Sequence, residues 1–137
     1  MATFRLQIIT PERVFLDEQA EMITVEAPDG QIGICAGHAP MLITTRESAI
    51  SIKRDGQWKV AAASDGTLTV TPDHVLLMLQ TIEWPEEIDT NRAHRDEERA
   101  REALRQKGSM QEYLLARAML SRAMVRLRVH DQANEGE

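Results

Sequence analysis

The sequence predicts an α+β protein whose strands and helices are segregated along the chain. We expect an N-terminal antiparallel β-sandwich or flattened barrel, followed by a C-terminal antiparallel hairpin of two helices. All five prolines and five of the seven glycines lie at or before residue 85. After Ile88 the apolar pattern changes from a period of two to a helical period. Residues 1–84 are therefore predicted to form the β domain and residues 85–137 the helical domain.

The first strand is predicted at Phe4–Ile9. Phe4, Leu6 and Ile8 alternate with Arg5 and Gln7, which is the pattern of a half-buried strand. Pro11 ends the pattern. Similar short apolar segments predict further strands at residues 14–16, 22–27 and 32–34.

Asp-Gly pairs mark three turns in the first half, because both residues readily adopt the positive φ angles of a tight hairpin. They are Asp29-Gly30, Asp55-Gly56 and Asp65-Gly66. Between residues 48 and 79, two of these pairs and Pro72-Asp73 predict a meander of about four strands. Many short strands at close spacing are typical of a sandwich or barrel.

Two helices are predicted in the second half. Asp89 is a favourable N-cap, and no Gly or Pro interrupts the stretch from there to Lys107. Gly108-Ser109 ends this helix, and a second helix is expected from about Met110 to Val129, with a disordered tail from about residue 130. Because the connection is short, the helices should be antiparallel neighbours.

The apolar residues of this hairpin are unevenly distributed. The first helix offers mainly Ala93, Ala100, Ala103 and Leu104, and the second offers Tyr113, Leu114, Leu115, Leu120, Met124, Val125 and Leu127. At about 25 cal/mol per Å² of buried apolar surface, an alanine stripe contributes little stability. We therefore expect a hairpin that is marginally stable alone and has two arrangements available to it.

Composition limits the class of protein. A chain of 137 residues with a net charge of −6 forms one domain or two small ones and lacks the basic surface of a nucleic-acid-binding protein. No apolar run approaches a membrane span, and Met1–Thr10 lacks the pattern of a signal peptide, which favours a soluble cytoplasmic protein. The single cysteine, Cys35, lies in an apolar run and is expected to be a small buried side chain and not a nucleophile.

Four arginines are placed to share helix faces. Arg92 and Arg99 lie on one face of the first helix, and Arg122 and Arg126 on one face of the second. If these faces meet, four guanidinium groups converge on a site suited to phosphate oxygens. The alternative is a solvated face on which the arginines pair with Asp96, Glu97, Glu98 and Glu102. Spacing alone favours the solvated face.

The chain shows no catalytic motif. It has no phosphate-binding Gly-x-x-x-x-Gly-Lys-Ser/Thr loop, and Gly30, Gly33 and Gly37 lack dinucleotide-fold spacing. Of the histidines, only His94 has helical spacing to an acidic residue, Glu98, which is weak evidence for a metal site. Ser64 before Asp65-Gly66 is explained by a turn. These features favour a binding or regulatory subunit with no catalytic residues and no metal.

Four segments, in this order and spacing, resemble the epsilon subunit of the bacterial rotary (F-type) ATP synthase. They are Ile9-Thr10-Pro11-Glu12, Gly33-Ile34-Cys35-Ala36-Gly37-His38-Ala39-Pro40, Ser64-Asp65-Gly66-Thr67-Leu68-Thr69-Val70 and Ala123-Met124-Val125-Arg126-Leu127. The resemblance covers nearly the whole chain. It implies a non-catalytic central-stalk subunit, peripheral to the cytoplasmic face of the membrane, whose sandwich binds the gamma subunit and the c-ring.

The resemblance also implies a mobile hairpin that, when extended, enters the alpha/beta catalytic head and inhibits ATP hydrolysis. Some members of the family bind ATP on the folded hairpin through the pattern Ile/Leu-Asp-x-x-Arg-Ala, which is intact here at residues 88–93. The implied ATP-binding residues are Glu83, Ile88, Asp89, Arg92, Ala93, Arg99, Arg122 and Arg126. In this arrangement Ile88 and Ala93 pack on adenine, Glu83 and Asp89 face its polar edge, and the arginines surround the phosphates.

This resemblance reverses the preference for a solvated arginine face and makes ATP a regulatory ligand that favours the folded hairpin, with magnesium left open. It further implies that Gln31, Gly33 and His38 contact gamma and the ring, with Gln31 and His38 at one end of the sandwich. Two other functions stay open: a free-standing nucleotide-sensing module and a small hydrolase that uses His38.

Overall fold

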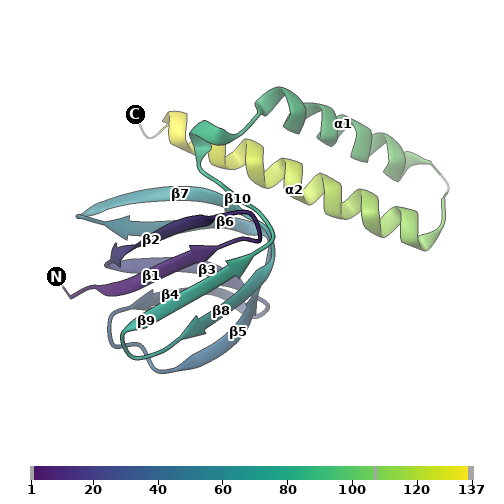
Figure 1. Ribbon diagram of the computed structural model, residues 1–137. Coiled ribbons are helices and arrows are strands. Elements are labelled where there is room, and N and C mark those ends of the chain that lie inside the picture. Colours follow the sequence, from purple (N-terminus) through teal and green to yellow (C-terminus); the bar gives the residue numbers. More distant parts are fainter. Residues whose placement is uncertain (1, 107, 136–137) are drawn as a thin grey trace.

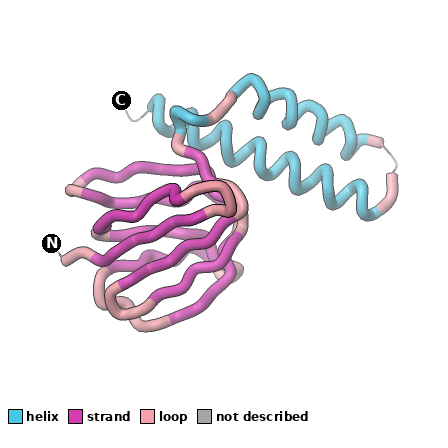
Figure 2. Tube along the Cα trace, in the orientation of Figure 1, coloured by secondary structure: helices cyan, strands magenta, loops and turns pink. Residues whose placement is uncertain are grey.

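The computed structural model describes residues 2–106 and 108–135, in which two stacked five-stranded sheets are followed by a helical hairpin (Figures 1 and 2). The segregated α+β fold is confirmed. In spatial order, the first sheet contains β2 (Val14–Ala20), β1 (Phe4–Ile9), β9 (His74–Leu79), β8 (Gly66–Val70) and β5 (Met41–Thr45). The second contains β10 (Ile82–Glu83), β7 (Gln57–Ala63), β6 (Ser48–Arg54), β3 (Met22–Ala27) and β4 (Gly30–Cys35).

The core lies between the two sheets and consists of alternate residues of the strands. Phe4, Leu6 and Ile8 are buried as expected, and they pack with the buried side chains of Ile52 and Leu68. Burial of each large aliphatic side chain contributes about 1.5–3 kcal/mol. The core of the sandwich is thus made entirely by the first part of the chain.

One predicted Asp-Gly turn, Asp55-Gly56, is confirmed, and the hairpin predicted at Asp29-Gly30 is present with its turn shifted by one residue. Asp55 and Gly56 form a two-residue turn between the paired residues Arg54 and Gln57, with φ angles of 50° and 75°. Positive φ at both central positions is the signature of a type I′ turn, whose twist matches that of the flanking strands. In the hairpin of β3 and β4, Ala27 pairs with Gly30, so the two turn residues are Pro28 and Asp29. Of the predicted pair, only Gly30 has a positive φ, of 128°.

The predicted four-stranded meander is wrong, because Asp65-Gly66 does not form a hairpin. β7 belongs to one sheet and β8 to the other, so this segment carries the chain between the sheets. The meander is therefore two separate hairpins, β6–β7 and β8–β9. A Cβ atom on Gly66 would overlap the carbonyl oxygen of Met78, so glycine is required here by close packing and not by a positive φ.

Ser64 fixes this passage between the sheets. Its hydroxyl accepts hydrogen bonds from the backbone N–H groups of Gln80 and Thr81, at 3.1 and 3.0 Å, and donates to the carbonyl of Asp65. These bonds satisfy a buried hydroxyl. Ser64 therefore has a structural role, as the turn interpretation expected.

Further differences concern pairing and missed strands. β1 pairs in parallel with β9 (Arg5 opposite His74), although an all-antiparallel sandwich was expected. β2 extends to Ala20, and β5 and β10 were not predicted. β5 is an edge strand with Leu42 exposed to solvent, which obscures its alternation, and β10 has only two residues.

The helices begin where their capping residues predict. α1 (Thr90–Arg105) is capped by Asp89, whose carboxylate accepts a hydrogen bond of 3.0 Å from the backbone N–H of Arg92. α2 (Met110–Glu135) is capped by Ser109, which accepts a bond of 3.1 Å from the N–H of Glu112. Residues 130–135 are helical and do not form the disordered tail that was expected. The predicted end of the first helix at Lys107 lies outside the described residues.

The hairpin buries alanines instead of large side chains. Ala93 and Ala100 are buried, which confirms the expected alanine stripe on α1 at these two positions, whereas Ala103 is exposed. Ala116 and Ala123 of α2 are also buried. The expectation for α2 is wrong at Tyr113, Leu114, Leu115 and Met124, which are 46–64% exposed. Figure 1 shows the reason for the first three, because the N-terminal half of α2 extends away from the sandwich and only its C-terminal half lies over the sheet. Met124 belongs to that C-terminal half but is exposed between the buried Ala123 and Val125.

The segment between the sandwich and the hairpin is firmly bound to the sandwich. It contains the short 3₁₀ helix η1 (Pro85–Glu87). The guanidinium group of Arg13 donates two hydrogen bonds to the Glu87 carboxylate, at 2.9 and 3.1 Å, which lower the pKa of Glu87. The Trp84 ring lies 4.5 Å from the Phe15 ring and 4.2 Å from the Lys59 ammonium group. These contacts fix the chain to the sandwich as far as Glu87, so any movement of the hairpin would have to begin after that residue.

Truncation after Asp89 should leave a folded sandwich. Both sheets and the core between them lie within residues 4–83, and the contacts of η1 are retained. We expect a cooperative thermal transition by circular dichroism, with a β spectrum and no helical signal. A truncated chain that melts without cooperativity would show that the hairpin is part of the folding unit.

Candidate functional site

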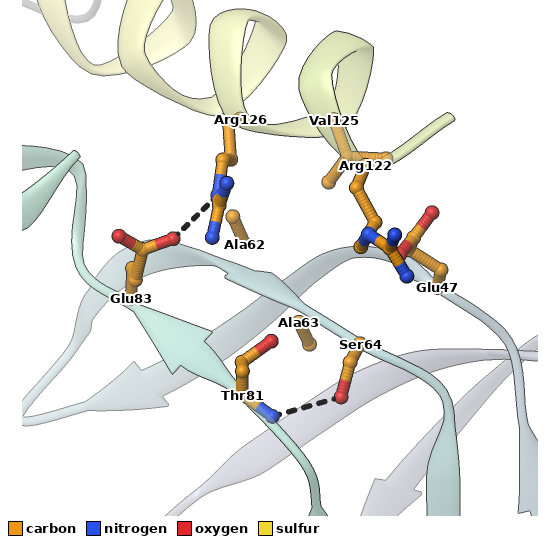
Figure 3. A pocket seen from close by; sticks show the side chains of 9 residues that line it. All are labelled: Glu47, Ala62, Ala63, Ser64, Thr81, Glu83, Arg122, Val125 and Arg126. Atoms are coloured by element: carbon orange, nitrogen blue, oxygen red, sulfur yellow. Dashed lines mark hydrogen bonds and ion pairs between the residues drawn. The ribbon is translucent and has the colours of Figure 1, made fainter. Parts of the chain in front are cut away.

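A small pocket lies where α2 crosses the second sheet (Figure 3). Four charged side chains line it: Glu83 from β10, Glu47 from the turn between β5 and β6, and Arg122 and Arg126 from α2. The Nε atom of Arg126 lies 2.7 Å from Oε1 of Glu83, and each of these side chains is 26% exposed. This ion pair joins the hairpin to the sandwich.

Local structure explains why these side chains meet. Ile82 is buried in the core, so the alternation of β10 directs the next side chain, Glu83, to the face that α2 covers. Arg122 and Arg126 lie about one turn apart on α2 and therefore share a face. Val125 packs with Ile88 and Ala62 in a small apolar cluster beside them, which also contains Val129. The apolar contact between α2 and the sandwich thus positions Arg126 beside Glu83.

The pocket itself is too small for a nucleotide. Its water-accessible volume is about 10 Å³, which holds about one water molecule. A larger depression of about 380 Å³ also borders Glu83 and Arg126 and is lined in addition by Arg13 and Glu87. A nucleotide at Arg126 would have to occupy this larger depression or displace α2.

The electrostatics of the pocket centre on Glu47. Its side chain is half-buried, and this burial raises the pKa of Glu47 above the ordinary value of 4.5. Asp65 raises the pKa further, while the Ser121 hydroxyl and the guanidinium groups of Arg122 and Arg126 oppose the rise without cancelling it. The neutral form of Glu47 is therefore favoured more in the folded protein than it would be in a fully exposed glutamate.

The structure brings together only part of the predicted ATP-binding set. Glu83, Arg122 and Arg126 share the pocket, and Ile88 packs next to it. Asp89 lies at the start of α1 as its cap, and Ala93 is buried within the hairpin. The roles proposed for these residues toward ATP stay a prediction.

The four arginine groups do not converge in this structure. Arg99 lies in a separate depression with Arg95 and Arg105, bordered by Glu98 and Glu102, and Arg92 is exposed. Without a bound anion, like-charge repulsion disfavours their convergence. On α1 the observed ion pairs, Arg101 with Glu97 and Arg105 with Glu102, are those of a solvated face.

The predicted partner-binding residues lie on and after β4, which is an edge strand. Gln31, Gly33 and Cys35 are exposed, and they alternate with Ile32 and Ile34, which are more buried. The expectation that Cys35 is buried is therefore wrong. Because Ile34 faces the core, the alternation of side chains along a strand places the next residue, Cys35, on the solvent side.

Gln31 and His38 do not lie together at one end of the sandwich, contrary to expectation. Gln31 is near the start of β4, beside Gln132 of α2, whereas His38 follows the end of the strand. A strand of this length spans about 20 Å. His38 places its Nδ1 atom 2.7 Å from the carbonyl oxygen of Ala39, and its contact with a partner stays a prediction.

Sequence reasoning missed Glu47 altogether. No motif distinguishes it, because its proximity to Arg122 arises from the packing of α2 on a distant turn. In the described part of the chain, no three potential metal-ligating side chains cluster. None of the helices in the described residues is long and apolar enough to cross a membrane.

Family models match both parts of the chain. Residues 3–85 match the ATP synthase delta/epsilon chain β-sandwich domain, and residues 86–131 match the long α-helix domain of the same family. The ATP synthase epsilon chain of Caldicellulosiruptor saccharolyticus is 41% identical over 100% of both chains. That of Caldanaerobacter subterraneus subsp. tengcongensis is 44% identical over 97% of each chain.

Solved structures show the same fold at lower identity. A chain of the mitochondrial ATP synthase of Euglena gracilis, solved as an OSCP/F1/c-ring assembly, superposes with a TM-score of 0.81 at 20% identity, covering 93% of this chain and 81% of that one. A chain of the central stalk and c-ring of the Tetrahymena thermophila mitochondrial enzyme has a TM-score of 0.63 at 11% identity, with 94% and 97% covered.

Proposed function

The chain belongs to the ATP synthase delta/epsilon chain family, and we propose that it acts as a non-catalytic central-stalk subunit that couples gamma to the c-ring and restrains ATP hydrolysis. The observation that carries this proposal is similarity over the full length to ATP synthase epsilon chains. Both the sandwich and the hairpin are included in that similarity.

The surface of the sandwich supports a role in binding partners. Val14, Leu42, Trp58 and Met78 are large apolar side chains that are 44–70% exposed. They lie on β2, β5, β7 and β9 in both sheets, so each would contribute apolar area to a separate contact with a partner and not to one continuous patch. In the proposed assembly the sandwich binds gamma and the c-ring and places the chain at the cytoplasmic face of the membrane.

The hairpin has the properties of a mobile regulatory element. It is held to the sandwich by a small apolar cluster and the Arg126–Glu83 ion pair, while Met110, Tyr113, Leu114 and Leu115 are exposed near its tip. Such limited contact allows release at a modest cost in free energy. The released hairpin would enter the alpha/beta head and block hydrolysis.

ATP is the proposed ligand of the docked hairpin. Arg122 and Arg126 offer guanidinium groups for the phosphates beside Glu83. A ligand that binds only the docked arrangement at 100 times its dissociation constant would favour that arrangement by about 2.7 kcal/mol. ATP would thus hold the hairpin in its non-inhibitory position.

Assembly and hydrolysis assays test this function. We expect a tagged full-length chain to co-purify with gamma, the c-ring and the alpha/beta head, and the chain truncated after Asp89 to do the same. ATP hydrolysis by the complex at low ATP should be faster with the truncated chain, because the inhibitory element is absent. A chain that purifies without partners would favour a free-standing module, and equal hydrolysis rates would remove the hairpin from regulation.

A further inference from the structure

We infer that Glu47 couples anion binding at Arg122 and Arg126 to the uptake of a proton. A polyphosphate at these arginines would bind more tightly when Glu47 is neutral than when it is charged. The inference rests on the proposed function, in which the anion is the triphosphate of ATP.

The geometry places Glu47 in competition with an incoming anion. Figure 3 shows its carboxyl group beside the guanidinium group of Arg122, on the opposite side of the pocket from the Arg126–Glu83 pair. Among the described residues Arg122 has no ion pair within 4.0 Å, whereas Arg126 is paired with Glu83. Arg122 is therefore the guanidinium group available to a phosphate, and Glu47 is the carboxyl group that such a phosphate would approach.

Glu47 is surrounded by charged groups from several elements. It also borders a second depression, on the side where Arg46 of the sandwich and Arg128 of α2 lie. The polar and charged groups that face it are Ser121, Arg122, Arg126 and Arg128 of α2, and Glu26, Arg46, Asp65 and Glu83 of the sandwich. The groups that favour the charged form of Glu47 are mostly arginines of the hairpin, and a bound phosphate would neutralise these arginines.

The sign of the coupling follows from this arrangement. In the free protein, burial already raises the pKa of Glu47, and Arg122 and Arg126 partly oppose that rise. A bound polyphosphate adds negative charge and offsets the two arginines, so the pKa of Glu47 rises further. Binding then takes up a proton, and affinity increases as the pH falls through the interval between the free and bound pKa values. Above both values Glu47 stays charged and affinity is lowest.

Calorimetric titration of the isolated full chain tests the inference with two probes, ATP and inorganic tripolyphosphate, both without divalent cations. Each titration is made between pH 4.5 and neutrality in two buffers of different ionisation enthalpy, which gives the number of protons taken up. Glu47→Gln should bind both probes about tenfold more tightly than wild type near neutral pH and take up fewer protons. Asp73→Asn makes the same change of charge in the exposed turn between β8 and β9, outside both depressions that Glu47 lines, and it should resemble wild type.

The outcomes separate this inference from the proposed ATP function. If wild type and Glu47→Gln bind both probes equally, or take up equal numbers of protons, the role of Glu47 is wrong while ATP binding stands. If tripolyphosphate binds with the expected effects of Glu47→Gln but ATP does not bind, the role of Glu47 stands and the ATP function is wrong. If neither probe binds any of the variants, both are wrong.

Discussion

Gly66→Ala is expected to destabilise the sandwich by about 3 kcal/mol and to lower its melting temperature by at least about 10 °C. The added methyl group would overlap the carbonyl oxygen of Met78 and would lie 2.5 Å from Cδ2 of Leu79. Gly66 and Leu79 are opposite each other in the pairing of β8 with β9. Relief of the overlap therefore requires the backbone of one strand to move away from the other.

Gly56→Ala is the matched control for this change. It adds the same methyl group at a position with nothing within 4 Å, but with a φ of +75°. Its cost is conformational and should be about 1 kcal/mol. Thermal denaturation of both variants by circular dichroism or calorimetry makes the comparison. If Gly66→Ala melts at or above the temperature of Gly56→Ala, the close approach of β8 and β9 is not rigid.

Arg126→Ala is expected to release the hairpin and to weaken ATP binding by more than tenfold. The change removes the 2.7 Å hydrogen bond to Glu83 and leaves a partly buried carboxylate without its partner. Bonds to charged groups contribute about 1.5–3 kcal/mol, which is a large share of what holds the hairpin. Backbone amides of α2 between residues 122 and 129 should then exchange hydrogen faster, and calorimetry should show the loss of ATP affinity.

Arg117→Ala is the control for Arg126→Ala, because Arg117 is an exposed arginine of the same helix that contacts the Tyr113 ring. It should leave both exchange and ATP affinity unchanged. In the assembled complex, Arg126→Ala should retain inhibition of hydrolysis at ATP concentrations that relieve it in wild type. Wild-type exchange rates and affinity in Arg126→Ala would contradict both the docking contact and the phosphate role.

Features decided by a few neighbouring residues could be predicted from the sequence. The alternation of Phe4, Leu6 and Ile8 located the first strand, and the Asp55-Gly56 pair located a tight turn. Asp89 set the start of α1 through its own side chain. In each case the determining interaction spans only a few positions of the chain.

Features that depend on distant partners could not be predicted. Asp65-Gly66 has the same local chemistry as Asp55-Gly56, yet its flanking strands pair with different sheets. Leu114 and Leu115 look like core residues, but no described element covers them. Glu47 lies near Arg122 only because α2 rests on the turn after β5. The sequence indicated which residues carry charge, but not which of these charges meet.

The parallel pairing of β1 with β9 has a consequence for how the chain is made. β1 is adjacent to both β2 and β9, and Arg5 lies opposite His74. The pairing of β1 is therefore incomplete until β9, one of the last strands of the sandwich, has been synthesised. Contacts between residues so far apart slow folding, because the entropy of closing the intervening loop is lost first. The nascent sandwich therefore stays open, with one side of β1 unpaired, until Leu79 has emerged. The contacts within the hairpin are local, and domains rich in such contacts fold in microseconds to milliseconds.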